Sequence, residues 1–133
     1  FNFLFNLHAK ATFYLLSAVM PVFKGLKAGS IVTIAAKLAV HPGKENAVYA
    51  ASKAAELSFT LTAAEEGRAD NIRANCIVPA VIRTPANAEG ADPSETMKWT
   101  PPQDIAGLIS FLLSDAANGI TGSVIPMYNK LHS

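Results

Sequence analysis

Gly29-Ser30-Ile31-Val32-Thr33-Ile34-Ala35-Ala36 is the stretch of the sequence that decides the fold class. It is short, rich in β-branched residues and almost wholly apolar, which is typical of a strand buried on both faces in a parallel sheet. Ile72–Val78 is a second apolar run of the same kind, and Pro79 closes it. We therefore expect two buried strands in one parallel sheet.

Helical patterns lie before and between these strands. Apolar residues at helical spacing predict a helix over about residues 7–24, with Pro21 near its end and Gly25 after it. Residues 47–66 are rich in Ala, Leu, Lys and Glu, and Gly67 follows them as a stop signal. A second, longer helix is therefore predicted between the two strands.

The last third of the chain adds one helix and one strand. Residues 80–102 contain four prolines and little periodicity, which predicts a long loop with at most a helical turn, of a length that usually carries function. Thr100–Asp104 begins a helix that Gly119 stops, and Ser123–Tyr128 is a last short strand. Strands that alternate with helices indicate an α/β fold with a parallel sheet, here in the order α-β-α-β-loop-α-β.

Composition excludes several classes of protein. The chain has 133 residues, of which 50% are apolar and 16% charged, so it forms one domain at most and is not a disordered polar tail. Its net charge of +1 predicts binding to neither nucleic acid nor a membrane surface. The longest uncharged stretch, Ala116–Asn129, is too short and too interrupted to span a bilayer, and no secretory signal is visible.

The single cysteine, Cys76, cannot form a disulfide within the chain. It lies in an apolar run, so we expect a buried core thiol rather than a nucleophile. A reducing, cytoplasmic compartment is the corresponding expectation for the protein, and no metal ligands are assigned.

Tyr49-Ala50-Ala51-Ser52-Lys53 is the motif that points to chemistry. On a helix, Tyr49 and Lys53 stand four residues apart and share one face. An ammonium near a phenol favours the phenolate, so Lys53 would lower the pKa of Tyr49 toward the range useful for a general acid or base. The alternative is a surface Tyr and Lys on an amphipathic helix. The pair nevertheless follows a buried strand and its loop, where the ligand sites of open α/β sheets lie.

Two further motifs follow in order along the chain. Residues 71–85, Asn-Ile-Arg-Ala-Asn-Cys-Ile-Val-Pro-Ala-Val-Ile-Arg-Thr-Pro, end the second strand at the same edge, and Ile120-Thr121-Gly122 precedes the last strand. Together with the Tyr49–Lys53 motif, they resemble the short-chain dehydrogenase/reductase family over nearly the whole chain. The resemblance implies a nicotinamide cofactor, NAD or NADP, and hydride transfer involving a small-molecule substrate.

The resemblance also implies roles for individual residues. By similarity, Tyr49 is the general acid/base, and Lys53 binds the nicotinamide ribose and lowers the pKa of Tyr49. The segment Pro79-Ala80-Val81-Ile82 would pass beside the nicotinamide, and Thr84 would bond its carboxamide or the phosphates.

Two positions depart from the family's pattern. Thirteen residues before Tyr49 the family usually places a catalytic serine, and this chain has Ala36, whose methyl group cannot hydrogen-bond a substrate carbonyl. In the preceding helix the family usually has an asparagine; this chain has His8 there, with Asn6 two residues out of register. We interpret His8 as a structural, half-buried histidine, with binding of water or of its own backbone as the alternative.

One branch of the family tolerates the loss of that serine. Residues 36–39, residues 81–87 and Trp99-Thr100-Pro101 look like dihydropteridine reductases and their bacterial relatives, which reduce a quinonoid pterin. The conjugated ring of that substrate accepts hydride readily and needs less carbonyl polarisation, so a tyrosine and a lysine suffice there. Trp99 either covers such a site from the loop or plugs the loop onto the core.

The glycine-rich turn that cradles a pyrophosphate is missing from the sequence. Gly25 and Gly29 have a suggestive spacing, but they follow a helix and precede a strand, which is the reverse of the required context. The residue that would select NAD or NADP is missing as well. The chain also opens on Phe1 rather than Met, directly into an apolar pattern. We therefore expect residues 1–133 to be a single partial domain, the C-terminal half of a doubly wound, Rossmann-type NAD(P)-binding domain.

Three hypotheses about function remain. The first is an NAD(P)-dependent oxidoreductase, and the second is a catalytically inactive remnant that acts as a dimerisation or scaffold unit, as Ala36 and His8 suggest. The third is an unrelated α/β binding domain, which the ordered set of motifs opposes. In the family the first two helices pair with those of a second subunit, which implies a homodimer or homotetramer. Phe13, Leu16 and Leu57 would serve that seam or, equally well, packing within one subunit.

Overall fold

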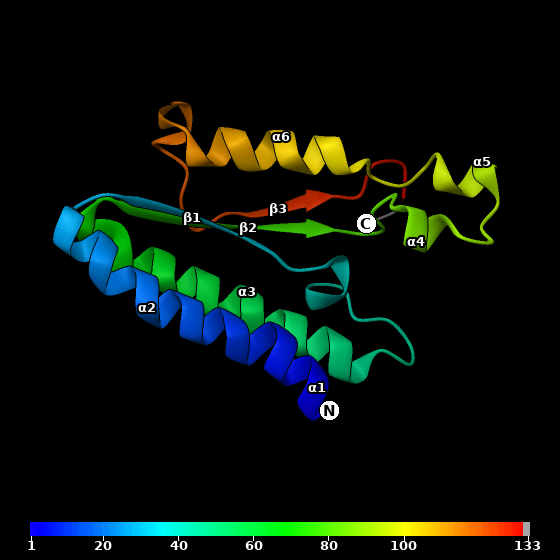
Figure 1. Cartoon of the computed structure of the whole chain (residues 1–133), viewed down its shortest axis with the longest axis horizontal. Helices are drawn as coiled ribbons and strands as arrows, with labels where there is room; N and C mark the ends of the chain where they lie inside the picture. Colours follow the sequence, from blue (N-terminus) through cyan, green and yellow to red (C-terminus); the bar gives the residue numbers. More distant parts are fainter. Residues whose placement is uncertain (132–133) are drawn as a thin grey trace.

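A three-stranded parallel sheet with helices on both faces forms the molecule (Figure 1). The structure is a computed structural model, and it describes residues 1–131. In the sheet, the order is β1-β2-β3, and the strands span Gly29–Ile34, Ile72–Pro79 and Val124–Met127. The helices α2 (Ala11–Leu26) and α3 (Ala47–Gly67) cover one face, and α6 (Pro102–Leu113) covers the other. The expected α/β class and order of elements are confirmed.

The first helix is longer than its sequence pattern predicts. It runs without a break from Asn2 to Leu26, as α1 (Asn2–Leu4), a π-helical segment (Phe5–Lys10) and α2. Gly25 does not end it, because Lys27 adopts the left-handed conformation with φ 55° and forms the cap instead. Pro21 lies inside the helix rather than at its end. Lys27 also pairs with Asp70, which fixes the turn into β1.

This helix bears on the expectation that no segment could cross a bilayer. Among the described residues, Asn2–Leu26 is long and apolar enough to do so by length and composition alone. The two lysines within it made the apolar pattern look interrupted in the sequence. A single such helix is weak evidence for a membrane span, since a signal sequence or the core helix of a soluble protein meets the same criterion.

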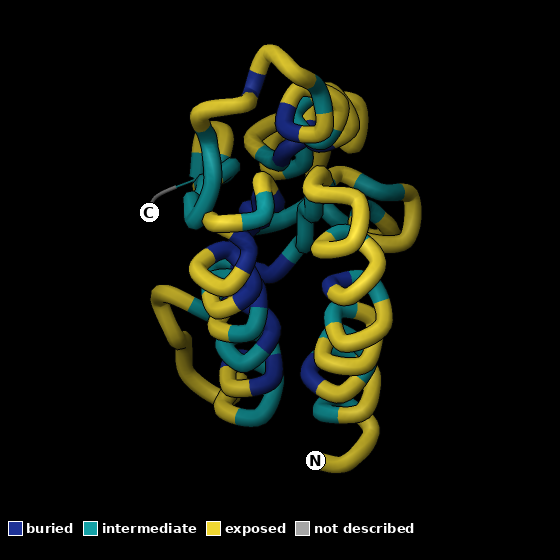
Figure 2. The backbone as a smooth tube through the Cα atoms, turned by 90° about the vertical axis from the view of Figure 1, so that its left-hand side faces the viewer, coloured by how far each residue is buried: buried dark blue, intermediate teal, exposed yellow. Residues whose placement is uncertain are grey.

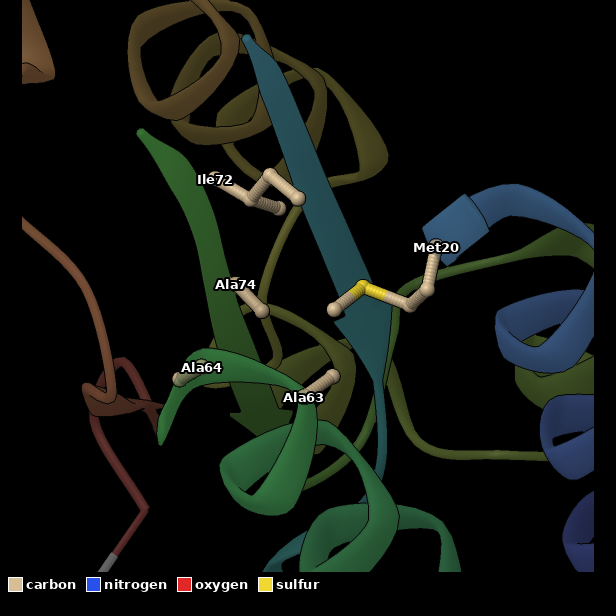
Figure 3. Close-up of a cluster of buried hydrophobic side chains, with 5 residues drawn as sticks. All are labelled: Met20, Ala63, Ala64, Ile72 and Ala74. Carbon is tan, nitrogen blue, oxygen red and sulfur yellow. The ribbon is translucent and has the colours of Figure 1, made fainter. Parts of the chain in front are cut away.

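β2 is the centre of the core. All eight of its residues are buried, and their side chains alternate between the two faces of the sheet. Ile72 and Ala74 pack with Met20 of α2 and with Ala63 and Ala64 of α3 (Figure 3). On the opposite face, Ile77 packs with Ile105 and Leu112 of α6. The expected burial of Cys76 is confirmed, and its neighbours are Ala35, Leu57 and Val78.

The expectation that β1 is buried on both faces is wrong for the described chain. All six residues of β1 are only half-buried, because the strand lies at the edge of the sheet and pairs with β2 alone. Beside it runs a largely apolar groove of about 370 Å³, lined by residues of α2 and β1 and by Glu56 of α3. The helix α2 is correspondingly exposed, with Met20 as its one buried residue, whereas α3 has eight (Figure 2).

Residues 80–102 are more ordered than the predicted loop. They contain two short helices, α4 (Pro85–Ala88) and α5 (Pro93–Thr96), each begun by a proline in its first turn. Ile82 and Thr100 form an isolated parallel bridge that ties the two ends of the segment together. The Thr100 hydroxyl donates to the carbonyl of Met127, 2.9 Å away, so the segment is also fixed to the end of β3.

Two polar side chains lie inside the strand that the sequence pattern treats as apolar. The Arg73 guanidinium donates to the carbonyl oxygens of Leu112 at 2.8 Å, Ala117 at 2.9 Å and Ser114 at 3.1 Å, where α6 ends. Asn75 bonds the backbone of Ile120 and Ser123. The chain after α6 is fixed to the sheet by these bonds, and α6 itself ends at Leu113, before the predicted stop at Gly119.

Candidate functional site

A cavity of about 370 Å³ opens at the carboxyl ends of β1 and β2. Parallel strands end at the same edge of a sheet, so the segments that follow them meet there. Ala35 and Ala36 follow β1, Pro79–Ile82 end and follow β2, and Tyr49 comes from the first turn of α3. Asn87 of α4 and Trp99 complete the lining. Residues from five separate parts of the chain thus share one cavity.

Tyr49 is the side chain at this cavity best suited to proton transfer. It is half-buried, and its hydroxyl has no hydrogen-bond partner among the residues that the structure describes. Among the described residues no buried side-chain nitrogen or oxygen lacks a hydrogen-bond partner, so the Tyr49 hydroxyl is reached by solvent and is available to a ligand in the cavity. The structure therefore places Tyr49 at the cavity wall, and its role as a general acid or base stays a prediction.

Lys53 lies one helical turn after Tyr49 and is almost buried. Its ammonium donates to the carbonyl oxygen of Ile34, at the end of β1, and to Glu56 Oε2, both at 3.1 Å. Burial raises the pKa of Glu56, and the Lys53 ammonium opposes that rise. The two charged groups are buried as a pair, and their attraction offsets part of the free energy needed to remove each from water. The proposed effect of Lys53 on the pKa of Tyr49 stays a prediction.

His8 reaches the same helix from the π-helical segment. Its Nδ1 lies 2.9 Å from Ser52 Oγ, and its ring meets the Tyr49 ring edge to face, with 5.5 Å between centroids and 89° between planes. The ring is half-buried, as the sequence interpretation expects. Its contact with Tyr49 makes it part of the site's surroundings, which that interpretation did not anticipate.

The remaining sequence-predicted residues divide into two groups. Pro79–Ile82 line the cavity with Tyr49, whereas Lys53 and Thr84 are not among its described lining residues. Thr84 is the N-cap of α4, and its hydroxyl oxygen accepts a hydrogen bond from the Asn87 amide at 3.1 Å. The hydroxyl proton of Thr84 is left to donate, so its predicted bond to a cofactor is compatible with this capping role.

Three residues near the site were not predicted from the sequence. Glu56 stands three residues after Lys53, and helical spacing alone would have paired them. Ser52 lies inside the quoted motif, but nothing local indicates that His8 bonds it across 44 residues. Asn87 donates to the carbonyl of Ile82 at 2.8 Å and lines the cavity, a position set by the fold of the α4 segment.

Known proteins match almost the whole length of this chain. A family model described as Enoyl-(Acyl carrier protein) reductase matches residues 1–128. The 7alpha-hydroxysteroid dehydrogenase of Bacteroides fragilis is 33% identical over 94% of this chain and 52% of its own length. Human dehydrogenase/reductase SDR family member 4 is 33% identical over 90% of this chain and 47% of its own. This chain belongs to the short-chain dehydrogenase/reductase family.

Solved structures of short-chain dehydrogenases/reductases have the same fold. A short-chain type dehydrogenase/reductase from Mycobacterium ulcerans superposes with a TM-score of 0.86 at 27% identity, over 95% of this chain and 50% of that one. The 4-hydroxyisoleucine dehydrogenase complexed with NADH gives a TM-score of 0.85 at 34% identity, over 94% and 56%. The three-stranded sheet is therefore part of a Rossmann-type fold.

The matches cover nearly all of this chain but only part of its relatives. The chain spans about half the length of the curated short-chain dehydrogenases/reductases that it matches. NADH is named in one structural neighbour, and NADP in another of 22% identity, which shares the fold alone. The family thus includes proteins that bind nicotinamide cofactors.

Proposed function

We propose that this protein is an NAD(P)-dependent oxidoreductase in which Tyr49 transfers the proton that accompanies hydride transfer. The observation that carries the proposal is the Tyr49 hydroxyl, which has no hydrogen-bond partner within residues 1–131 and lies at the cavity that the two strand ends form. A phenol there can donate its proton to a substrate oxygen or nitrogen as hydride arrives, or accept it in the reverse direction. Membership of the short-chain dehydrogenase/reductase family supports the assignment.

In this proposal, Lys53 binds the cofactor ribose and lowers the pKa of Tyr49. Two of its ammonium protons go to Ile34 and Glu56, which leaves one for a ribose hydroxyl near Tyr49. The positive charge would favour the phenolate of Tyr49 and so lower the pKa of the phenol. Glu56 keeps the ammonium close to the end of β1 in either state of Tyr49.

The cavity walls suit the nicotinamide end of a cofactor. Ala35, Ala36 and the backbone of Pro79–Ile82 leave a volume of about 370 Å³ beside Tyr49. When bound, NAD or NADP supplies or accepts the hydride. Pro79–Ile82 would border the nicotinamide, and Thr84 would donate to its carboxamide or to the phosphates. Among the described residues no glycine-rich turn joins a strand to a helix.

A phosphate site would then belong to a region equivalent to the half of the relatives that this chain does not match. Residues 1–133 are, on this proposal, the C-terminal half of a Rossmann-type NAD(P)-binding domain. Support comes from β1, which is half-buried at the sheet edge, and from the apolar groove beside it. A further strand and helix would cover both.

The substrate that fits best is a conjugated ring such as a quinonoid pterin, with a simple carbonyl compound as the second candidate. Ala36 lines the cavity with a methyl group, so this position offers no hydroxyl to polarise a carbonyl. Trp99 lines the same cavity, where its indole offers a flat apolar wall to a planar ring. A conjugated ring depends less on carbonyl polarisation and gains more from such a wall.

The exposed face of α2 and α3 supports a homodimer or homotetramer. Phe13 of α2 is exposed and lies beside Phe59 of α3, with 5.6 Å between the ring centroids. Apolar side chains on a helix surface are often covered by a partner. Leu16 and Leu57, in contrast, pack into the core of the chain itself. We also propose a cytoplasmic location, on the basis of the single reduced cysteine.

The test is oxidation of NADH or NADPH by a purified protein that contains residues 1–133 together with the proposed phosphate-binding half, followed at 340 nm with a quinonoid dihydropterin and with a panel of ketones. Tyr49→Phe should lower turnover by about a hundredfold, because proton transfer contributes a factor of that order. Tyr14→Phe, which alters an exposed tyrosine of α2, is the matched control.

Near-normal turnover in Tyr49→Phe would reject Tyr49 as the proton donor. Absence of turnover in the wild-type protein with every substrate and both cofactors, in a folded dimer, would favour the scaffold hypothesis instead. Turnover of ketones but not of the pterin would leave the oxidoreductase assignment intact and overturn the substrate class.

A further inference from the structure

His8 occupies an unusual place in the backbone. The π-helical segment Phe5–Lys10 interrupts a helix that is otherwise α-helical from Asn2 to Leu26. Single π-helical turns leave the regular hydrogen-bond ladder, and they are frequent at functional sites. His8 lies in the middle of this segment and faces the first turns of α3, where it contacts Tyr49 and Ser52.

The hydrogen bonds around Ser52 determine which nitrogen of His8 carries the proton. The Ser52 hydroxyl donates its only proton to the carbonyl oxygen of Tyr49, 2.8 Å away. Ser52 Oγ can then only accept from His8, so Nδ1 must be the donor in the 2.9 Å bond. The neutral imidazole is therefore the Nδ1–H tautomer, and its Nε2 bears a lone pair.

The charges around His8 favour this neutral form. Burial lowers the pKa of His8 below 6.5, and the nearby Lys53 ammonium lowers it further. The groups that face His8 from α3 are Tyr49 and Lys53, and Glu56 is paired with Lys53 rather than with His8. On its own helix, Lys10 lies over the ring of Tyr14, 5.7 Å from the centroid.

We propose that His8 is a positioning residue for Tyr49: the neutral imidazole, tied to Ser52, holds the phenol ring at the cavity, and protonation of His8 at Nε2 keeps the bond to Ser52 but weakens the hold on the phenol ring. A protonated ring would bring a second positive charge beside Lys53 and disturb the edge contact with the phenol. The kinetic part of this inference rests on the proposed function of Tyr49. The structural part does not, since the contacts exist without substrate.

The structural part is tested by NMR on the protein without substrate. Titration should give His8 a pKa below the ordinary 6.5 and ¹⁵N shifts of the Nδ1–H tautomer, and the Tyr49 ring resonances should shift with the same midpoint. In His8→Asn these Tyr49 shifts should vanish from that pH range. His41→Asn alters an exposed histidine and is the control. Tyr49 resonances that ignore the titration of His8, or an Nε2–H tautomer, would overturn the proposal.

The kinetic part compares two substitutions at His8. The side-chain amide nitrogen of Asn occupies the same bonded position as Nδ1, so His8→Asn should keep the bond to Ser52 and most of kcat, but lose the fall in kcat at acid pH. His8→Leu removes the bond and should lower kcat about tenfold, with little change in the KM for the cofactor. An acid limb that persists in His8→Asn, or an unchanged kcat in His8→Leu, would contradict the positioning role.

The two parts separate this inference from the proposed function. If the protein catalyses no hydride transfer, the NMR titration still decides whether His8 controls the Tyr49 ring. If hydride transfer occurs but Tyr49→Phe retains it, the proposed role of Tyr49 as proton donor fails while the titration result stands.

Discussion

Two polar clusters lie at opposite ends of β2, and they are built in opposite ways. Near the start of the strand, the Arg73 guanidinium donates hydrogen bonds to backbone carbonyls at the end of α6. Beyond the other end, the Tyr49 hydroxyl lines a cavity without a partner among the described residues. The first cluster is closed, since the protein itself satisfies its donors. The second is open, and its hydrogen bond remains to be made.

A polar group that stabilises the fold can therefore be distinguished from one that is available to react with a ligand. In the closed cluster the positive charge of Arg73 meets the carbonyl end of a helix, where the aligned peptide dipoles favour a cation. Such a group stabilises the fold through the donors that it directs at the backbone. At the open site, small side chains keep a volume clear beside one titratable group.

The largest effect is expected at the closed cluster. Arg73→Met should lower the free energy of unfolding by about 3 kcal/mol, because buried carbonyls at the end of α6 lose charged hydrogen-bond donors. Urea denaturation followed by circular dichroism measures it. Arg68→Met, which removes an exposed arginine paired with Glu65, should leave the free energy of unfolding essentially unchanged. Equal stability of Arg73→Met and wild type would show that the cluster is not structural.

A smaller effect, on activity rather than stability, is expected from a new donor at the open site. Ala36→Ser places a hydroxyl in the cavity beside Tyr49, where it can polarise a substrate carbonyl. We expect kcat/KM for ketones to rise about tenfold, since one donor to developing charge typically contributes at least that much. Steady-state kinetics measure it, with Ala51→Ser on the exposed side of α3 as the control. No gain with any ketone would place the substrate carbonyl away from Ala36.

The smallest effect is expected from Glu56, which is paired with Lys53 near the open site. Its folded-state pKa is raised by burial above the ordinary 4.5. Its contribution to stability is therefore fully present below pH 4.5 and is lost as the pH rises through the folded-state pKa. Gln stays neutral and can still accept from Lys53, so Glu56→Gln should remove this loss and be at least as stable as wild type at pH 7.

Denaturation midpoints measured between pH 4 and 8 decide this point. Glu66→Gln, at an exposed position of α3, should retain the Glu56-dependent loss. If Glu56→Gln is instead less stable at pH 7 and equally stable at acid pH, the ion pair with Lys53 outweighs the cost of burial.

The sequence predicted the order of elements and much of the candidate site. Helical spacing and β-branched runs are local signals, so the strands at residues 29 and 72 and the helix after Asn46 appear close to their predicted limits. The common edge of parallel strands explains why Tyr49 and Pro79–Ile82 meet, as the family resemblance implies. The half-burial of β1 could not be predicted, because it depends on which neighbours the edge strand has.

Long-range partners are the part that sequence patterns could not supply. Arg73 and Asn75 interrupt an apolar strand, and nothing nearby indicates that they bond carbonyls about forty residues later along the chain. His8 was interpreted only as a structural histidine, because its contacts lie 44 residues away on Ser52 and, in the same helix, on Tyr49. The bonds of Lys53 to Ile34 and Glu56 likewise depend on how α3 docks against β1.

The sequence was enough to predict an α/β fold with a tyrosine and a lysine one helical turn apart. It also shows Ala36 at the position where the family usually has a serine. Those properties follow from residue type and local spacing, which operate within a few turns of backbone. Only the tertiary structure decided which polar groups are closed and which are open. Satisfying a buried donor requires a particular acceptor from a distant segment, and that choice is made when helices and strands pack.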